Sequence, residues 1–230
     1  MTRAGGDGSR NDPEVRSVVA GIGWPGIPSD PGAHLAALLF QLERSQWLPE
    51  PLLRERQLAQ LRLLLLHARQ TVPHYAESLR GLDLDRLDWE GFRTLPPLSR
   101  KALQERFDAL RSSAVPPGHG RIVQGMSSGS TGMPVRFLQT EATQLFWNAL
   151  TLREHLWQER DFSGKLAAIR VKVEEGRWPD WGLPAAALFR TGPGATLNVS
   201  TDVGRQLDWL VREDPDYLIT HASNLHALAE

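Results

Sequence analysis

Eight consecutive residues combine small hydroxyl side chains with glycines, a composition suited to holding phosphate. Glycine adopts positive φ without steric cost and lets the backbone approach a ligand closely, so successive N–H groups can point into one hollow that binds an oxyanion. Ser and Thr hydroxyls add further donors at the rim. The sequence therefore predicts a phosphate-binding loop formed by Ser127, Ser128, Gly129, Ser130, Thr131, Gly132, Met133 and Pro134.

Short runs of β-branched and aromatic residues flank this loop and predict two strands, over residues 121–124 and 135–139. Pro134 excludes a helix directly after the loop. A Walker A loop would need Lys-Ser or Lys-Thr after its last glycine, followed by a helix, and Met133 and Pro134 stand there instead. We therefore expect a strand, then the loop, and then a second strand. The same composition also forms ordinary flexible turns, which remains an open alternative.

Composition limits the class of protein. The chain has 230 residues, enough for one domain with a sizeable core or for part of a larger one, and its net charge of -1 with no basic run argues against a nucleic-acid partner. The absence of cysteine excludes disulfides, thiolate metal sites and a cysteine nucleophile, and fits a reducing cytosol. No apolar window is long enough to span a bilayer, and the first residues lack the apolar core of a secretory signal. We expect a cytoplasmic protein with no membrane partner.

The histidines offer no metal site and no catalytic residue is assigned. None of the seven forms His-x-x-x-His or His-Glu-x-x-His, and His221 and His226 are five residues apart, off one helical face. Phosphate binding is the chemistry that the residues favour.

The fold class predicted is α/β, with three parts in sequence. Residues 1–33 are expected to be disordered or irregular, residues 34–118 to form a helical lead-in, and residues 119–230 to form a partial α/β nucleotide-binding region of the same large domain. Strands alternating with helices after residue 120 predict a mainly parallel sheet flanked by helices. Capping residues are expected at Ser99, at Thr140 and at Thr201 or Asp202.

Several finer expectations concern side chains and connections. A helix is predicted from near Pro51 to before Pro73, with Leu64 on its apolar stripe. The helix after Thr140 is expected to bury a stripe that includes Phe146. Two further aromatic residues of that helix should pack against neighbouring elements, with the lining of a pocket for an aromatic substrate as the alternative. They are Trp147 and Trp157. Residues 174–193 are expected to be an irregular, exposed connection, because they are rich in Gly, Pro and Trp.

The loop resembles the phosphate-binding loop of the adenylate-forming superfamily, whose usual form is Ser/Thr-Ser-Gly-Ser/Thr-Thr-Gly-x-Pro. Seven of the eight positions fit that form, and the eighth, often Lys, is Met133. A second resemblance covers residues 57–137, which look like the helical lead-in and loop of phenylacetate-CoA ligases and the related coenzyme F390 synthetase-like proteins. Its pieces, in order, are residues 57–69, Val72-Pro73-His74-Tyr75, Leu95-Pro96-Pro97-Leu98-Ser99-Arg100 and the loop.

These resemblances imply an ATP-dependent acid–CoA ligase. Such enzymes hold ATP with the loop, let a carboxylate attack the α-phosphate, release pyrophosphate, and pass the acyl group to a thiol such as that of coenzyme A. The implied ligands are ATP, Mg²⁺, coenzyme A and a carboxylic acid, with aromatic acids among the candidates. The loop amides and the hydroxyls of Ser127, Ser128, Ser130 and Thr131 would stabilise charge on the leaving pyrophosphate. Met133 in place of Lys removes one positive charge beside the phosphates.

The downstream motifs of that family are expected to be missing. The aromatic-Gly-x-Thr-Glu motif, the ribose-binding aspartate and the lysine of the C-terminal lid domain would lie beyond Glu230. We therefore expect an incomplete adenylate-forming N-terminal domain, completed in a longer product or by a second chain, with uncovered strand edges. One alternative is a non-catalytic nucleotide-binding or interaction protein derived from the same fold. Another is an unrelated helical protein in which the loop match arose by chance.

Overall fold

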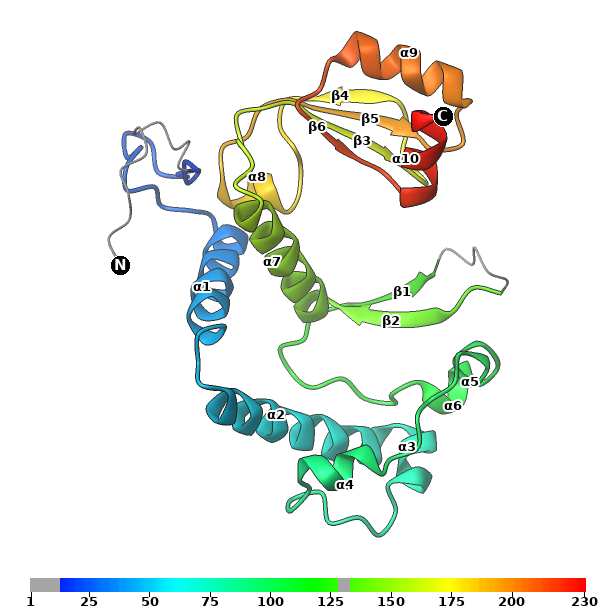
Figure 1. The fold of residues 1–230 in the computed structure, drawn as a ribbon. Helices are drawn as coiled ribbons and strands as arrows, with labels where there is room; N and C mark the ends of the chain where they lie inside the picture. The colour runs from blue at the N-terminus through cyan, green and yellow to red at the C-terminus, as the bar shows by residue number, and fades with distance from the viewer. Residues whose placement is uncertain (1–12, 128–132) are drawn as a thin grey trace. The chain divides into compact units, whose positions relative to one another are not determined.

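A computed structural model describes residues 13–127 and 133–230 and shows an α/β chain (Figure 1). The chain divides into two compact units. One is the contiguous segment Phe40–Trp147, and the other joins the start of the chain, up to Leu39, with Asn148–Glu230. Among the helices of the described ranges, none combines the length and the apolar character that crossing a membrane requires.

The Phe40–Trp147 unit begins with helices, and a small leucine core lies among the earlier ones. The helices are α2 (Glu50–Thr71), α3 (Pro73–Ser78), α4 (Trp89–Arg93), α5 (Arg100–Glu105) and α6 (Phe107–Leu110). The core consists of Leu65, Leu79, Leu84 and Leu87, which are all at most 8% exposed. The predicted cap at Ser99 is confirmed, because its hydroxyl accepts the backbone N–H of Ala102 at 3.2 Å.

An antiparallel pair of strands follows, β1 (Ile122–Met126) and β2 (Arg136–Thr140). They confirm the two predicted strands on either side of the loop, with bounds shifted by one or two residues. α7 (Glu141–Trp157) begins directly after β2, and Thr140 caps it by accepting the backbone N–H of Thr143 at 3.2 Å. The chain therefore leaves the hairpin straight into a helix.

The other unit contains a four-stranded sheet in the order β4-β5-β3-β6. Its strands are β3 (Leu166–Arg170), β4 (Gly176–Trp178), β5 (Gly194–Asn198) and β6 (Tyr217–Ile219). β3 pairs in parallel with β5 and with β6, whereas β4 pairs antiparallel with β5. The sheet is therefore mixed, with a parallel centre and an antiparallel edge.

Two helices cover one face of this sheet, α9 (Val203–Glu213) and α10 (Ala222–Ala229) (Figure 1). The residues that alternate inward along the two central strands are Ala167, Ile169, Ala195 and Leu197, and Trp209 of α9 packs against them. The predicted cap at the start of α9 is Asp202, which accepts the backbone N–H of Gly204 at 3.0 Å.

A buried polar link joins α9 to α10. Gln206 is 1% exposed and donates to the carbonyls of Val199 and Thr201, while its oxygen accepts the side-chain amide of Asn224 at 2.8 Å. Because each buried polar atom of the link has a partner, it fixes the rotation of the two helices instead of costing stability.

The beginning of the chain adds to the same unit. Val15 forms an antiparallel bridge with Phe189, and α1 (Asp30–Ser45) follows an irregular stretch. Arg190 donates its backbone N–H to the carbonyl of Glu14 at 2.8 Å and forms an ion pair with the same residue at 3.0 Å.

Residues 174–193 correct one expectation, because they are not a structureless exposed connection. They contain β4 and the short helix α8 (Ala185–Leu188), and Leu188 is 2% exposed. Trp181 stacks on Phe162 with ring centroids 5.2 Å apart. Trp181 of this segment therefore packs against a partner outside the segment.

The aromatic residues of α7 correct a second expectation. The helix buries Ala149, Leu152 and His155, whereas Phe146 is 54% exposed. The two tryptophans are also largely exposed and take no place in a core. These are Trp147 and Trp157. On α2, similarly, Leu64 of the predicted apolar stripe is 60% exposed.

Candidate functional site

Two hydrogen bonds close the base of the predicted phosphate loop. The backbone N–H of Ser127 donates to the carbonyl of Val135 at 2.9 Å, and the backbone N–H of Val135 donates to the hydroxyl oxygen of Ser127 at 2.8 Å. This pair prolongs the β1–β2 ladder by one step, with a side chain in place of a carbonyl. The Ser127 hydroxyl keeps its own proton for donation to a ligand.

Three of the eight predicted phosphate-binding residues lie within the described part of the chain, Ser127, Met133 and Pro134. The other five lie outside the described residues. They are Ser128, Gly129, Ser130, Thr131 and Gly132. Met133 has an exposed side chain, and its carbonyl accepts the side-chain amide of Gln104 from α5. The returning end of the loop is therefore attached to the helical part of the same unit.

A glycine and an aromatic ring fix the hairpin just below the loop. Gly125 stands opposite Phe137 in the ladder, and the Phe137 ring lies across it. A Cβ on Gly125 would lie 2.4 Å from the Phe137 ring, closer than real Cβ atoms approach other atoms. Only glycine therefore leaves the ring in place.

Arg136 is the first cation after the loop. Its guanidinium carbon lies 4.2 Å from the centre of the Phe107 ring of α6, which holds it by a cation–π interaction. The described residues give Arg136 no carboxylate partner. Arg136 therefore places a positive charge on the strand that follows the loop, whereas Met133 adds no charge within the loop.

The far end of the hairpin is attached to α7. Arg121 and Glu141 form an ion pair at 2.8 Å, and the Glu141 backbone N–H donates to the Arg121 carbonyl at 3.2 Å. Their side-chain hydrogen bond raises the pKa of Arg121 and lowers the pKa of Glu141. Both side chains are exposed, so this pair orients the hairpin more than it stabilises it.

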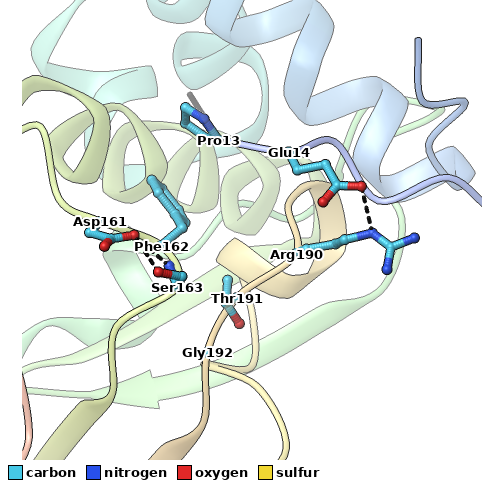
Figure 2. A pocket seen from close by; sticks show the side chains of 8 residues that line it. All are labelled: Pro13, Glu14, Asp161, Phe162, Ser163, Arg190, Thr191 and Gly192. Atoms are coloured by element: carbon cyan, nitrogen blue, oxygen red, sulfur yellow. Dashed lines mark hydrogen bonds and ion pairs between the residues drawn. The ribbon is translucent and has the colours of Figure 1, made fainter. Parts of the chain in front are cut away.

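The other unit contains a hollow of about 310 Å³, shown in Figure 2. Its charged groups engage one another: Glu14 pairs with Arg190, and Asp161 accepts both the hydroxyl and the backbone N–H of Ser163, at 2.7 and 2.8 Å. Gly192 completes the wall, because a Cβ there would lie 2.1 Å from the Ser163 carbonyl oxygen. These contacts join three segments of the unit, and each charged side chain in the described lining takes part in one of them.

A buried charge cluster lies at the end of α9. Glu213 is 4% exposed and accepts two hydrogen bonds from Arg177 at 2.9 Å and one from Lys165 at 3.0 Å. The hydrogen bond from Arg177, followed by that from Lys165, lowers the pKa of Glu213 to about 2. This carboxylate is fully ionised at neutral pH and acts as a structural anchor for β4. In the described part of the chain, no three His, Cys, Asp or Glu side chains gather in a way that could hold a metal ion.

Two residues that contact the loop strands were missed from the sequence, Gln104 and Phe107. Gln104 holds the Met133 carbonyl and Phe107 holds Arg136. Neither carries a sequence signal of its own, because a polar and an aromatic residue on short helices have many ordinary roles.

Comparison of the chain with protein-family models, with curated proteins and with solved structures gave no match.

Proposed function

We propose that this chain supplies the nucleotide-binding segment of an ATP-dependent acid–CoA ligase of the phenylacetate-CoA ligase type, with residues 127–134 holding the triphosphate. The observation that carries the proposal is the pair of hydrogen bonds between Ser127 and Val135, which closes the base of the loop. The seven residues between these two positions connect two paired strands. A loop rich in Gly, Ser and Thr that is anchored in this way suits a ligand with many acceptor oxygens.

The chemistry of the proposal has two steps. A carboxylate oxygen attacks the α-phosphorus of ATP, and the bond to the pyrophosphate oxygen breaks. The sulfur of coenzyme A then attacks the acyl carbon, and AMP leaves. The loop donors act on the charge that develops on pyrophosphate, an effect that typically accounts for about 10²-fold in rate per donor.

One contact of the described residues supports this assignment of roles, and the side chains near the loop bear on the metal. Gln104 fixes the Met133 carbonyl, so Met133 contributes its backbone, not a charge, to the loop. Mg²⁺ would bind mainly through the phosphates themselves, since the described residues place no set of carboxylates to hold a metal ion. The cation would share the negative charge of the triphosphate when bound.

Titration calorimetry with MgATP tests the proposal directly. We expect binding by the natural protein, and at least a 10-fold loss of affinity in the double variant Ser130→Ala/Thr131→Val, which removes two hydroxyl donors. The matched control is Ser78→Ala, at the end of α3 and outside the hairpin, which should bind as the natural protein does. Pyrophosphate exchange into ATP, dependent on one acid from a panel of aryl and alkyl acids, would then identify the reaction.

Either of two results would overturn the proposal: no affinity for MgATP, or an affinity that is the same with and without the two loop hydroxyls. Binding without exchange for any acid would instead favour the non-catalytic alternative.

The exposed apolar side chains of the hairpin favour an interaction protein as the second candidate. Five are at least 36% exposed: Ile122, Val123, Met126, Phe137 and Leu138. They occupy both faces of a two-stranded sheet, which is marginally stable by itself. Cross-linking of the natural protein in cell extract, compared with the variant Val123→Lys, would test whether a partner covers the hairpin.

A further inference from the structure

A groove of about 620 Å³ lies within the Phe40–Trp147 unit, between α2, the α5–α6 segment and the hairpin. The volume is in the range of sites for drug-sized ligands. The ladder register places Ile122, Arg136, Leu138 and Thr140 on one face of the hairpin, and this face lines the groove. The groove is therefore a built feature of one unit.

The wall of the groove is mostly apolar and unusually exposed. Leu63 and Leu64 of α2 are 62% and 60% exposed, and Ile122 on the hairpin is 51% exposed. Exposed aliphatic side chains of α2 and of the hairpin that line one hollow present an apolar surface, which is typical of a binding site. The ligand should therefore carry an apolar body.

The charged side chains in the described wall of the groove are positive. None of the described residues that line it is Asp or Glu, whereas two are arginines. Both arginines belong to the α6 end: Arg136 stacks on Phe107, the first residue of α6, and Arg111 is the residue that ends this helix. The described residues pair neither arginine with a carboxylate. Two arginines in the wall of the same groove favour an anionic head group.

A polar cluster beside Arg111 completes this end of the groove. The Ser112 hydroxyl lies 2.8 Å from the hydroxyl of Thr71, which lies 3.3 Å from Nε2 of His67. Both Ser112 and His67 line the groove, so the α6 end also offers further hydrogen-bonding groups. An apolar groove that ends in cations and hydroxyls matches a molecule with an alkyl tail and an acidic head.

We propose that this groove binds an alkyl carboxylate of medium chain length, with the tail against Leu63, Leu64 and Leu138 and the carboxylate at Arg111 and Arg136. None of the described residues of the proposed nucleotide site lines this groove, and binding there requires no activation of the carboxylate. It is a binding site of the helical unit, and it holds whether or not residues 127–134 bind ATP.

Displacement of a fluorescent probe tests the site. The apolar anion 8-anilinonaphthalene-1-sulfonate should become fluorescent with the natural protein, and decanoate, kept below its micelle concentration, should displace it. Decyl sulfate should displace it as well, because the shared chemistry is an anionic head. Decanol and decyltrimethylammonium should be at least 10-fold weaker. Equal displacement by all four would overturn the proposal, because charge would then have no part in binding.

Variants assign the two ends. Arg111→Gln/Arg136→Gln should weaken decanoate at least 10-fold and leave decanol unchanged, while Leu64→Glu should weaken both. The control Arg56→Gln/Arg80→Gln makes the same change of charge at exposed positions outside the groove and should bind decanoate as the natural protein does. Circular dichroism and thermal unfolding confirm that each variant is folded.

Gel filtration tests the other possible occupant of the groove, which is a second copy of the chain. A dimer that Leu64→Glu dissociates, combined with no displacement by decanoate, would overturn the proposal. Failure of the natural protein to bind MgATP, together with normal decanoate binding, would remove the nucleotide proposal and leave this one intact.

Discussion

The backbone N–H of Val135 donates a hydrogen bond to the hydroxyl oxygen of Ser127, at 2.8 Å, at the point where the hairpin opens into its loop. Replacing Ser127 by Ala removes this acceptor and should lower stability by about 1 kcal/mol, whereas Ser127→Thr keeps an acceptor at the same place. Amide hydrogen exchange at Val135, followed by NMR, checks this directly. We expect faster exchange in Ser127→Ala only, and equal exchange in both variants would show that the hydroxyl does not hold the loop.

Glu213 should contribute stability that depends on pH. Its pKa is about 2 in the folded chain, compared with an ordinary value of 4.5, chiefly because of Arg177 and then Lys165. A lowered carboxyl pKa stabilises the fold above about pH 4.5 and loses that effect as the pH falls through about 2. Glu213→Gln should therefore cost on the order of 1–2 kcal/mol at pH 7, allowing for the exposed Arg177, and much less near pH 2.

Urea unfolding at a series of pH values measures this difference. The matched control is Glu175→Gln, which breaks the exposed 2.7 Å ion pair with Arg212 and should cost less than about 0.5 kcal/mol. A difference between wild type and Glu213→Gln that does not change between pH 7 and pH 3 would contradict the assignment.

His155 should make the fold sensitive to mild acid. Burial, and then the positive charge of Arg160, lower the pKa of His155 below 6.5, and the Arg160 guanidinium donates to its Nδ1 at 2.7 Å. Below about pH 6.5 the unfolded chain therefore takes up a proton that the folded chain refuses, and stability falls until the pH passes the folded pKa. His155→Phe, which can keep the contacts with Phe162 and Trp181, should reduce this loss.

Thermal unfolding between pH 7.5 and pH 5 tests the histidine prediction. His34→Gln, at an exposed position of α1, serves as the control and should leave the pH profile of the natural protein unchanged. If His155→Phe showed the same dependence on pH as the natural protein, another group would be responsible.

Gly192 should tolerate no side chain, because backbone surrounds it. A Cβ would lie 2.1 Å from the carbonyl oxygen of Ser163 and 2.4 Å from that of Gly164. Gly192→Ala should therefore lower stability by about 1–3 kcal/mol, as overpacking does in cores. Gly23→Ala has no heavy atom within 4 Å of its new Cβ and should stay within about 0.5 kcal/mol of wild type. Chemical unfolding of the two variants, compared side by side, decides the point.

The features that the sequence predicted well depend on residues close together in the chain. The caps at Ser99, Thr140 and Asp202 each use a backbone N–H two or three positions ahead, and the strands beside the loop follow from short apolar runs. Of the predicted phosphate site, the strand-to-loop transition could be read from composition. The attachment of the loop to α5 through Gln104 could not.

The features that were missed depend on distant partners. Arg177 finds Glu213 thirty-six positions away, and Trp181 stacks on Phe162, so a segment that looks like a loop by composition contains a strand and a helix. On α7 the prediction placed Phe146 in the buried stripe and overlooked His155, because hydrophobicity alone does not reveal a polar residue that is enclosed by aromatic rings.

The division of the chain has a consequence for the order in which it folds. The Phe40–Trp147 unit is contiguous, so during synthesis it can reach its structure as soon as it leaves the ribosome. Glu14 and Val15, although made earlier, find Arg190 and Phe189 only after most of the chain has been translated. Glu14 and Val15 are therefore among the last of the described residues to reach their native position.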